Sequence, residues 1–136
     1  MLLLQLIADV CMIGPKLYIA SADHSHVGTT SLHQDVTSAV NIMLYADDTS
    51  ATCGAEWTIF QRKDAPALRE YLRQSRQHPS GDPILSTDYF LNDDDFKALE
   101  TLHIHPFRFT QRVGEAVFIN VGCPHQVRSM NSVAAY

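Results

Sequence analysis

The stretch of sequence that decides the fold is FRFTQRVGEAVFINVGCPHQVRSM, residues 107–130. Within it, Phe107–Gln111 and Ala116–Val121 are short runs rich in aromatic and β-branched residues, which predict strands with a turn between them. Gly122–His125 contains the glycine and proline of a second tight turn, after which Gln126–Met130 starts a last strand. Strands that follow one another through tight turns predict an antiparallel sheet.

The residues before this stretch predict further strands and two helices. Three strands are expected, at Lys16–Ala20, Val40–Tyr45 and Glu56–Gln61. The polar, glycine-containing segment Ser21–Ser31 is expected to be a loop. One amphipathic helix is expected over 65–77, with Asp64 as its N-cap. A second begins at Asn92 or Asp93, and its apolar face comprises Phe96, Leu99 and Leu102.

The order of elements indicates the fold class. Strands come first, two helices are inserted together over residues 64–103, and strands follow. Segregated strands and helices predict a mainly β protein with helical insertions, built as a double-sheet jelly roll or barrel. A length of 136 residues predicts one domain, residues 1–136.

Composition narrows the function classes. The chain has 10 Lys and Arg against 15 Asp and Glu, a formal net charge of −5. This balance argues against a broad basic face, so no direct nucleic-acid site is expected. Cys11, Cys53 and Cys123 are widely spaced and predict reduced thiols rather than a disulfide framework. The apolar start, residues 1–14, is too short for a membrane span, and we expect it to be a core strand or helix.

The strongest chemical signal is a histidine and an aspartate two residues apart. His33 and Asp35 follow GTTSL in the segment GTTSLHQD, residues 28–35. In extended backbone, side chains at i and i+2 lie on one face, so both can reach one ion. With His125 they would form the two-histidine, one-carboxylate facial triad of non-haem Fe(II) oxygenases. Spacing alone leaves two alternatives open: a surface loop in which His33 and Asp35 hydrogen-bond, and a core role for His125.

From Cys11 to Val133 the chain resembles a JmjC domain, most closely the group that demethylates lysine 9 of histone H3. The matching segments are GPKLY (14–18), GTTSLHQDVTSAVNIMLY (28–45), GAEWTIF (54–60), LREYL (68–72), DPI (82–84) and QRVGEAVFINVGCPHQVRSM (111–130). The resemblance implies a double-stranded β-helix, the cupin-like jelly roll of this family, incomplete at both ends.

The resemblance also implies roles for individual residues. His33, Asp35 and His125 match the catalytic iron ligands. Thr30 and Asn41 match residues that face 2-oxoglutarate, and Tyr18 lies where relatives place an aromatic near the methylated nitrogen of the substrate. The implied reaction oxidises an N-methyl group with O2 and 2-oxoglutarate, and it releases succinate, CO2 and formaldehyde. The implied partner is a methylated histone H3 tail or another lysine-containing peptide, with chromatin contacted indirectly, in the nucleus.

Three departures from the family pattern leave other functions open. Ala55 stands where many JmjC proteins place a lysine that pairs with 2-oxoglutarate, and Lys16 and Lys63 are the nearest alternatives. The chain stops at Tyr136, where the family continues with another core strand, so one sheet is expected to keep an unpaired edge. The segment from Asp47 to Gly54 is short. A non-catalytic JmjC-like chromatin interaction module and a protein side-chain hydroxylase therefore remain alternatives.

Other candidate residues have simpler interpretations. The pairs His24/His26 and His103/His105 are interpreted as solvated or helix-end residues. Asp93, Asp94 and Asp95 are interpreted as a helix N-terminus rather than as a peptide-steering patch. Trp57 and Phe60 are expected in the core, and a Cys123–His125 nucleophile pair is disfavoured because near neighbours rarely point at each other.

Overall fold

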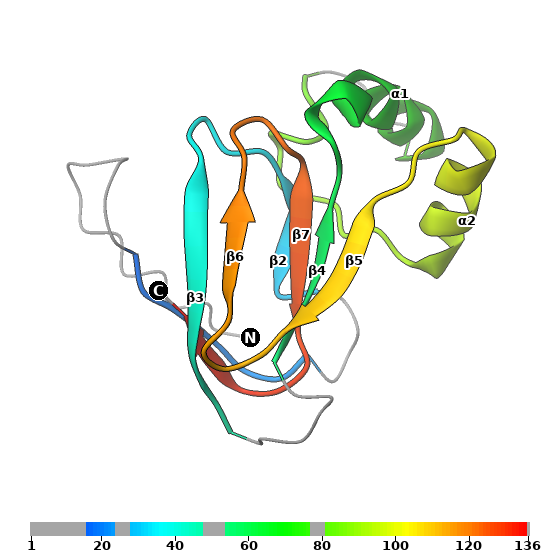
Figure 1. Cartoon of the computed structure of the whole chain (residues 1–136). Coiled ribbons are helices and arrows are strands. Elements are labelled where there is room, and N and C mark those ends of the chain that lie inside the picture. Colours follow the sequence, from blue (N-terminus) through cyan, green and yellow to red (C-terminus); the bar gives the residue numbers. More distant parts are fainter. Residues whose placement is uncertain (1–15, 24–27, 48–53, 77–80, 136) are drawn as a thin grey trace.

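The computed structural model describes residues 16–23, 28–47, 54–76 and 81–135, which form two antiparallel sheets with helices to one side (Figure 1). The first sheet has the order β1-β8-β3-β6 and the second the order β2-β7-β4-β5. The first consists of β1 (Tyr18–Ala20), β8 (Val133–Ala135), β3 (Ala39–Ala46) and β6 (Ala116–Ile119). The second consists of β2 (Thr30–His33), β7 (His125–Ser129), β4 (Ala55–Ile59) and β5 (Phe107–Gln111). This arrangement confirms the predicted mainly β jelly roll.

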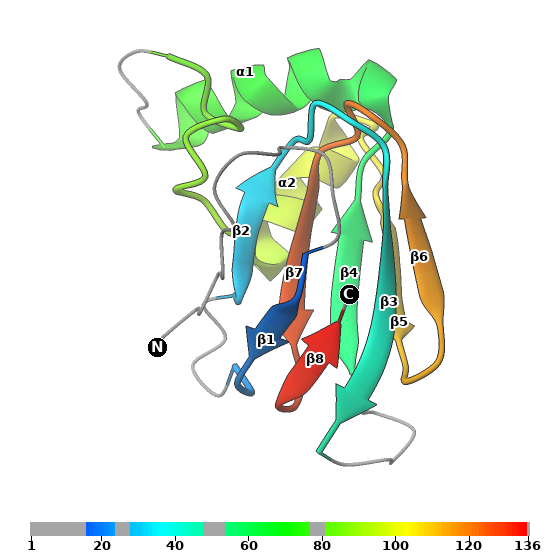
Figure 2. The same cartoon turned by 90° about the vertical axis from the view of Figure 1, so that its left-hand side faces the viewer.

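The helix α2 lies behind the second sheet, on its outer side, and α1 runs across the upper ends of the strands (Figure 2). A 3-10 turn, η1 (Arg62–Asp64), leads directly into α1 (Ala65–Arg76), and α2 (Asp93–Thr101) follows. Asn92 caps α2, because its side chain accepts hydrogen bonds from the backbone of Asp94 and Asp95 while the Asp95 side chain accepts from the backbone of Asn92. No helix of the described part of the chain is long and apolar enough to cross a bilayer.

Two apolar clusters fill the spaces between the layers. The cluster between the helices and the second sheet comprises Leu32, Phe60, Leu68, Leu72, Ile84, Leu91, Leu99 and Ile104. The cluster between the two sheets comprises Met43, Ala46, Ala55, Trp57, Val117, Ile119, Val133 and Ala135. The alternation of β6, in which Val117 and Ile119 are buried while Ala116 and Phe118 are exposed, shows how a strand of period two supplies one face to this core. Both Trp57 and Phe60 are buried, as predicted.

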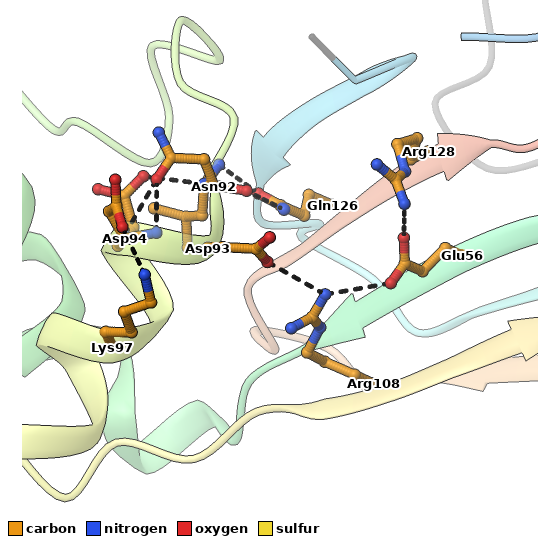
Figure 3. A network of polar contacts seen from close by, with 10 residues as sticks. Glu56, Asn92, Asp93, Asp94, Lys97, Arg108, Gln126 and Arg128 are labelled. Carbon is orange, nitrogen blue, oxygen red and sulfur yellow. Dashed lines mark hydrogen bonds and ion pairs between the residues drawn. The ribbon is translucent and has the colours of Figure 1, made fainter. Parts of the chain in front are cut away.

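A polar network on the outer face of the second sheet fastens α2 (Figure 3). Glu56 of β4 accepts hydrogen bonds from Arg108 of β5, at 3.1 Å, and from Arg128 of β7, at 2.5 Å. Arg108 also lies 3.8 Å from the carboxylate of Asp93, the first residue of α2, and its guanidinium lies 4.3 Å from the centre of the Phe96 ring. Asp93 thus brings the start of α2 close to the second sheet, and the three aspartates lie in the first turn of a helix, as predicted.

Two short strands differ from the sequence expectations. Thr30–His33, whose first two residues were expected in a loop, is β2, and it pairs with β7 through an irregular register between Thr30 and His33. The strand β8 was not predicted; it lies between β1 and β3 and pairs with both, while β1 and β6, at the two ends of this sheet, each have one partner among the described strands. Both strands are too short to show an alternating pattern, and pairing with neighbours distant in sequence defines them.

Two details of the helices also differ. Leu102 was expected on the apolar face of the second helix, but it is the C-cap residue, and its side chain is exposed. Asp64 was expected to be the N-cap of the first helix, but it is the last residue of η1, which runs directly into α1. The expectations for residues 1–14, Cys11, Cys53, His24 and His26 lie outside the described residues.

Candidate metal centre

The fold brings His33, Asp35 and His125 together. His33 is the last residue of β2, and His125 is the first residue of β7; the two are direct cross-strand partners in the antiparallel pair. Their ring centres lie 4.1 Å apart. The Asp35 carboxylate lies 3.9 Å from Nε2 of His33 and 3.8 Å from Nε2 of His125. One ligand atom from each of the three residues lies within 4.8 Å of the others, so the geometry could accommodate a metal ion.

These separations can be compared with metal–ligand bond lengths. Two ligand atoms that each lie roughly 2.1 Å from one ion are about 3.0 Å apart at a right angle, and at most about 4.2 Å apart. The distances of 3.9 Å from His33 Nε2 to Oδ1 of Asp35 and of 3.8 Å from His125 Nε2 to Oδ2 of Asp35 fall below that limit. The Asp35 side chain is 40% exposed, so its carboxylate can move the small distance that tighter coordination requires. The residues present therefore fit a metal ion with two nitrogen ligands and one oxygen ligand.

Backbone carbonyls orient both imidazoles. Nδ1 of His33 donates to the carbonyl oxygen of Ser31 at 2.8 Å, and Nδ1 of His125 donates to that of Cys123 at 3.0 Å. A neutral imidazole that carries its proton on Nδ1 has a free lone pair on Nε2. Both Nε2 atoms lie beside the Asp35 carboxylate. Outer contacts of this kind hold metal-binding histidines in the required tautomer and orientation.

Burial keeps His125 in its neutral form. Desolvation lowers the pKa of the His125 imidazole below its usual 6.5, and the nearby His33 lowers it further. The side chain of His125 is 4% exposed, whereas that of His33 is 24% exposed. A neutral imidazole is the form that binds a metal, so His125 is ready to bind at neutral pH. The two more exposed ligands leave one side of the site open to the solvent.

A cavity of about 130 Å³ between the two sheets adjoins the three residues. Thr30, Asn41 and Tyr18, the other predicted site residues, all line it. Oδ1 of Asn41 is buried and has no hydrogen-bond partner among the described residues. An unsatisfied buried amide oxygen is uncommon, and at a cavity wall it indicates a position where a ligand or a water is bound. Burial of Tyr18 and its proximity to Asp35 raise the pKa of its phenol, so Tyr18 retains its hydroxyl proton at neutral pH.

The cavity has no lysine or arginine among its described lining. Ala55 lines it at the position where a lysine was sought, and neither Lys16 nor Lys63 is among the lining residues. Lys63 instead lines a separate groove near β5 and β6, together with Cys123. Apart from the three candidate ligands, the polar side chains at the cavity are hydroxyls and amides, which include Thr29, Thr30, Asn41, Gln111 and Ser129.

Two residues not singled out from the sequence help to build the site. Gln111 is buried; it accepts a hydrogen bond from Nε1 of Trp57 at 2.8 Å and donates to the carbonyls of Asn41 and Glu115, each at 3.0 Å. The Trp57 ring in turn stacks on His125, with ring centres 5.9 Å apart. Residues 107, 109 and 111 share one face of β5, and Gln111 is the buried residue of this strand. A polar residue in line with two phenylalanines was the signal that the sequence offered.

Gln126, directly after His125, is the second such residue. Its amide accepts a hydrogen bond from the backbone of Leu91 at 2.8 Å and donates one to the carbonyl of the same residue at 3.0 Å. The segment that leads into α2 is thereby fastened to β7 beside the candidate metal centre. Gln126 is one of the largest fully buried side chains, and its place in the HQV segment was not distinctive without the structure.

Comparison with known proteins shows one matching family over most of the chain. Residues 24–135 match the family described as "JmjC domain, hydroxylase". The chain is 30% identical to "Lysine-specific demethylase JMJ26" of Arabidopsis thaliana, over 88% of this chain and 20% of that protein. It is 32% identical to "Lysine-specific demethylase 3" of Drosophila melanogaster, over 88% and 19%, and 28% identical to "Lysine-specific demethylase 3A" of Homo sapiens, over 88% and 12%. The match thus spans a fifth or less of the length of these relatives.

Proposed function

Because the chain belongs to the JmjC domain family, we propose that it acts as an Fe(II)- and 2-oxoglutarate-dependent dioxygenase that demethylates lysine in a peptide. The observation that supports this most directly is the convergence of His33, Asp35 and His125 beside a cavity. Two imidazoles and a carboxylate on one side of an ion are typical of non-haem Fe(II) oxygenases, because they leave coordination positions free for cosubstrate and O2.

The residues divide into an ion-binding set and a cosubstrate-binding set. His33, Asp35 and His125 would hold the iron through Nε2, a carboxylate oxygen and Nε2. When bound, iron with 2-oxoglutarate and O2 supplies the oxidation of an N-methyl group, which leaves as formaldehyde while succinate and CO2 are released. Thr30 and Asn41 would bind 2-oxoglutarate, and the unsatisfied amide of Asn41 supports this assignment. The side-chain amide of Asn41 can be turned by about 180°, which exchanges its oxygen and nitrogen, so Asn41 can donate a hydrogen bond to a carboxylate from the same position.

The remaining walls of the cavity would exclude water and orient the substrate. Trp57, Met43 and Ile119 are buried apolar residues that line the cavity. Tyr18, on β1, lines the same cavity, and its side chain is part-exposed and protonated. We assign it to the side of the slot that receives the methylated lysine, where an aromatic ring bounds an alkyl chain and its hydroxyl can donate a hydrogen bond.

We propose a methylated histone H3 tail, modified at lysine 9, as the substrate peptide, and a nuclear, chromatin-linked setting. The names of the relatives, which are lysine-specific demethylases, support a methyl-lysine substrate. The formal net charge of −5 suits a basic peptide, because opposite charges speed association.

A non-catalytic JmjC module is the second candidate. The observation that favours it is the absence of a lysine or arginine from the described lining of the cavity, which leaves no permanently charged cation there to pair with the distal carboxylate of 2-oxoglutarate. Neutral donors still bind carboxylates, though more weakly than charged ones. A protein side-chain hydroxylase would use the same ion site, and it differs in the product.

Trp57 provides a direct assay of the ion site. It is the single tryptophan of the chain and stacks on His125, so a transition-metal ion bound at His125 is expected to quench its fluorescence. Anaerobic titration with Fe(II) should quench the wild type and the control His105→Ala, whose histidine is exposed on another part of the chain, but not His33→Ala. Equal quenching in His33→Ala would contradict the assignment of the ion site.

A second assay tests the reaction. The wild type with Fe(II), 2-oxoglutarate and a dimethyl-lysine H3 peptide should release formaldehyde, and Asp35→Ala should not. A product that gains an oxygen instead of losing a methyl group would identify a side-chain hydroxylase. Fe(II) binding without either product would favour the non-catalytic module.

A further inference from the structure

A single side chain links the two parts of the chain that supply the ion ligands. Gln34 lies between His33 and Asp35, and its Nε2 donates to the carbonyl oxygen of Gly122 at 2.8 Å, across 88 positions of sequence. The backbone N–H of Gly122 returns a hydrogen bond to the carbonyl of Asp35 at 3.2 Å. Gly122 belongs to the turn that leads into His125. The early ligand pair and the late ligand are therefore joined by a two-way contact outside the ion site itself.

The helical insertion holds Gln34 from its other side. The guanidinium of Arg69, on α1, donates from one terminal nitrogen to Oε1 of Gln34 at 2.6 Å and from Nε to the Asp82 carboxylate, also at 2.6 Å. The other oxygen of Asp82 accepts from the backbone of Ile84 at 2.9 Å. Hydrogen bonds to a charged group are stronger than neutral ones, and a planar guanidinium held at two points has a defined orientation. Arg69 therefore holds the Gln34 amide with its N–H toward Gly122.

Gly122 is shaped for this contact. Its φ of +79° lies in the left-handed region, and a Cβ placed there would lie 3.2 Å from Nε2 of Gln34. A side chain at this position would press against the amide that donates to the turn. Glycine thus permits both the backbone conformation and the close approach of Gln34.

We propose that Gln34 and Arg69 are positioning residues for the metal ion. Arg69 orients Gln34, and Gln34 sets the spacing between the His33–Asp35 segment and the turn before His125. This inference rests on the proposed function, because it assumes that an ion binds to these three ligands. It assigns the helix α1 a role at the metal centre, although α1 provides none of the three candidate ligands.

Metal affinity tests the proposal without using catalysis. Co(II) binding is measured through Trp57 fluorescence and the visible absorption of the bound ion in the wild type, Gln34→Leu, Gln34→Glu, Arg69→Met and the double variant Gln34→Leu/Arg69→Met. Gln34→Glu keeps the acceptor for Arg69 but loses the donor to Gly122. Loss of an outer contact of this kind weakens metal binding by about 10- to 100-fold. We expect losses of that order in both Gln34 variants and a similar loss in Arg69→Met.

Matched controls come from the same helix. Gln74→Leu and Arg73→Met remove an exposed amide and an exposed guanidinium of α1 whose contacts are with Glu70. They should bind Co(II) as the wild type does. All proteins are compared at a temperature at which circular dichroism shows them folded. Loss of folding alone would leave the absorption spectrum of bound Co(II) unchanged in shape, whereas displaced ligands change it.

The double variant gives the decisive comparison. If Arg69 acts through Gln34, the double variant loses no more affinity than the weaker-binding single variant, because coupled residues are not additive. The proposal is overturned if Gln34→Leu and Gln34→Glu bind Co(II) within about threefold of the wild type, because loss of an outer contact should cost more. It is also overturned if the loss of Co(II) affinity in the double variant equals the product of the losses in the two single variants. If the wild type fails to bind Co(II), or His33→Ala binds equally well, the proposed function fails instead.

Discussion

Replacement of Gln111 by leucine tests how strongly a buried amide supports the candidate metal centre. Leucine has similar bulk, but it cannot accept from Nε1 of Trp57 or donate to the carbonyls of Asn41 and Glu115. A buried donor left without its partner costs about 1–3 kcal/mol, and each further lost hydrogen bond about 0.5–1.5 kcal/mol. The Glu115 carbonyl keeps a second partner, the backbone N–H of Met43, so its share is small. We expect the free energy of unfolding to fall by about 3 kcal/mol.

Urea unfolding followed by far-ultraviolet circular dichroism measures this change. Thr110→Val is the matched control, because Thr110 is the exposed neighbour of Gln111 on β5, and its effect should stay within about 0.5 kcal/mol. In a Trp57→Phe background, Gln111→Leu should be less destabilising by about 1–3 kcal/mol, since the donor that loses its partner is already gone. A loss below about 1 kcal/mol, or the same loss in both backgrounds, would refute this account of Gln111.

Three further changes test other parts of the structure. Gly122→Ala combines a strained positive φ with a close approach to Gln34, so thermal unfolding should show a loss of about 1 kcal/mol or more, and an unchanged midpoint would contradict the strain. Asn92→Ala removes the capping box of α2 and should lower the free energy of unfolding by about 1 kcal/mol, whereas Asn92→Asp should retain most of it. The pKa of His125 is lower in the folded metal-free protein than in the unfolded chain. When the pH is lowered below about 6.5, the unfolded chain therefore binds the proton more readily, and the free energy of unfolding decreases. Urea unfolding between pH 7 and pH 5.5 should show a shallower fall in His125→Asn, and parallel slopes would refute the assignment.

Local patterns in the sequence predicted the longer elements of the fold. The runs of β-branched and aromatic residues in β3, β4, β5 and β6 and the i, i+3, i+4 spacing of α1 depend on residues near one another in the chain. The strands β2 and β8 escaped prediction because they have four and three residues and exist through pairing with distant partners. Leu102 was misplaced because the helix ends just before it, a boundary that apolar spacing does not define.

The three candidate metal ligands could be predicted from the sequence, but the residues that hold them in place could not. The two-residue spacing of His33 and Asp35 indicated a shared face, and the resemblance added His125. That both histidines are cross-strand partners depends on the register of β2 against β7, which no local pattern contains. The roles of Gln34, Arg69 and Gln111 depend on side-chain contacts between distant segments, so they became visible only in three dimensions.

The position of β2 at the edge of its sheet has a dynamic consequence. β2 pairs with β7 on one side, and the ladder between them is interrupted just before His33. Outer strands of this kind detach most readily in local opening. An ion shared between His33 and His125 would act as a clasp across that weak ladder, so saturation with metal should slow amide hydrogen exchange in residues 30–33 more than in β4, which is enclosed by partners on both sides.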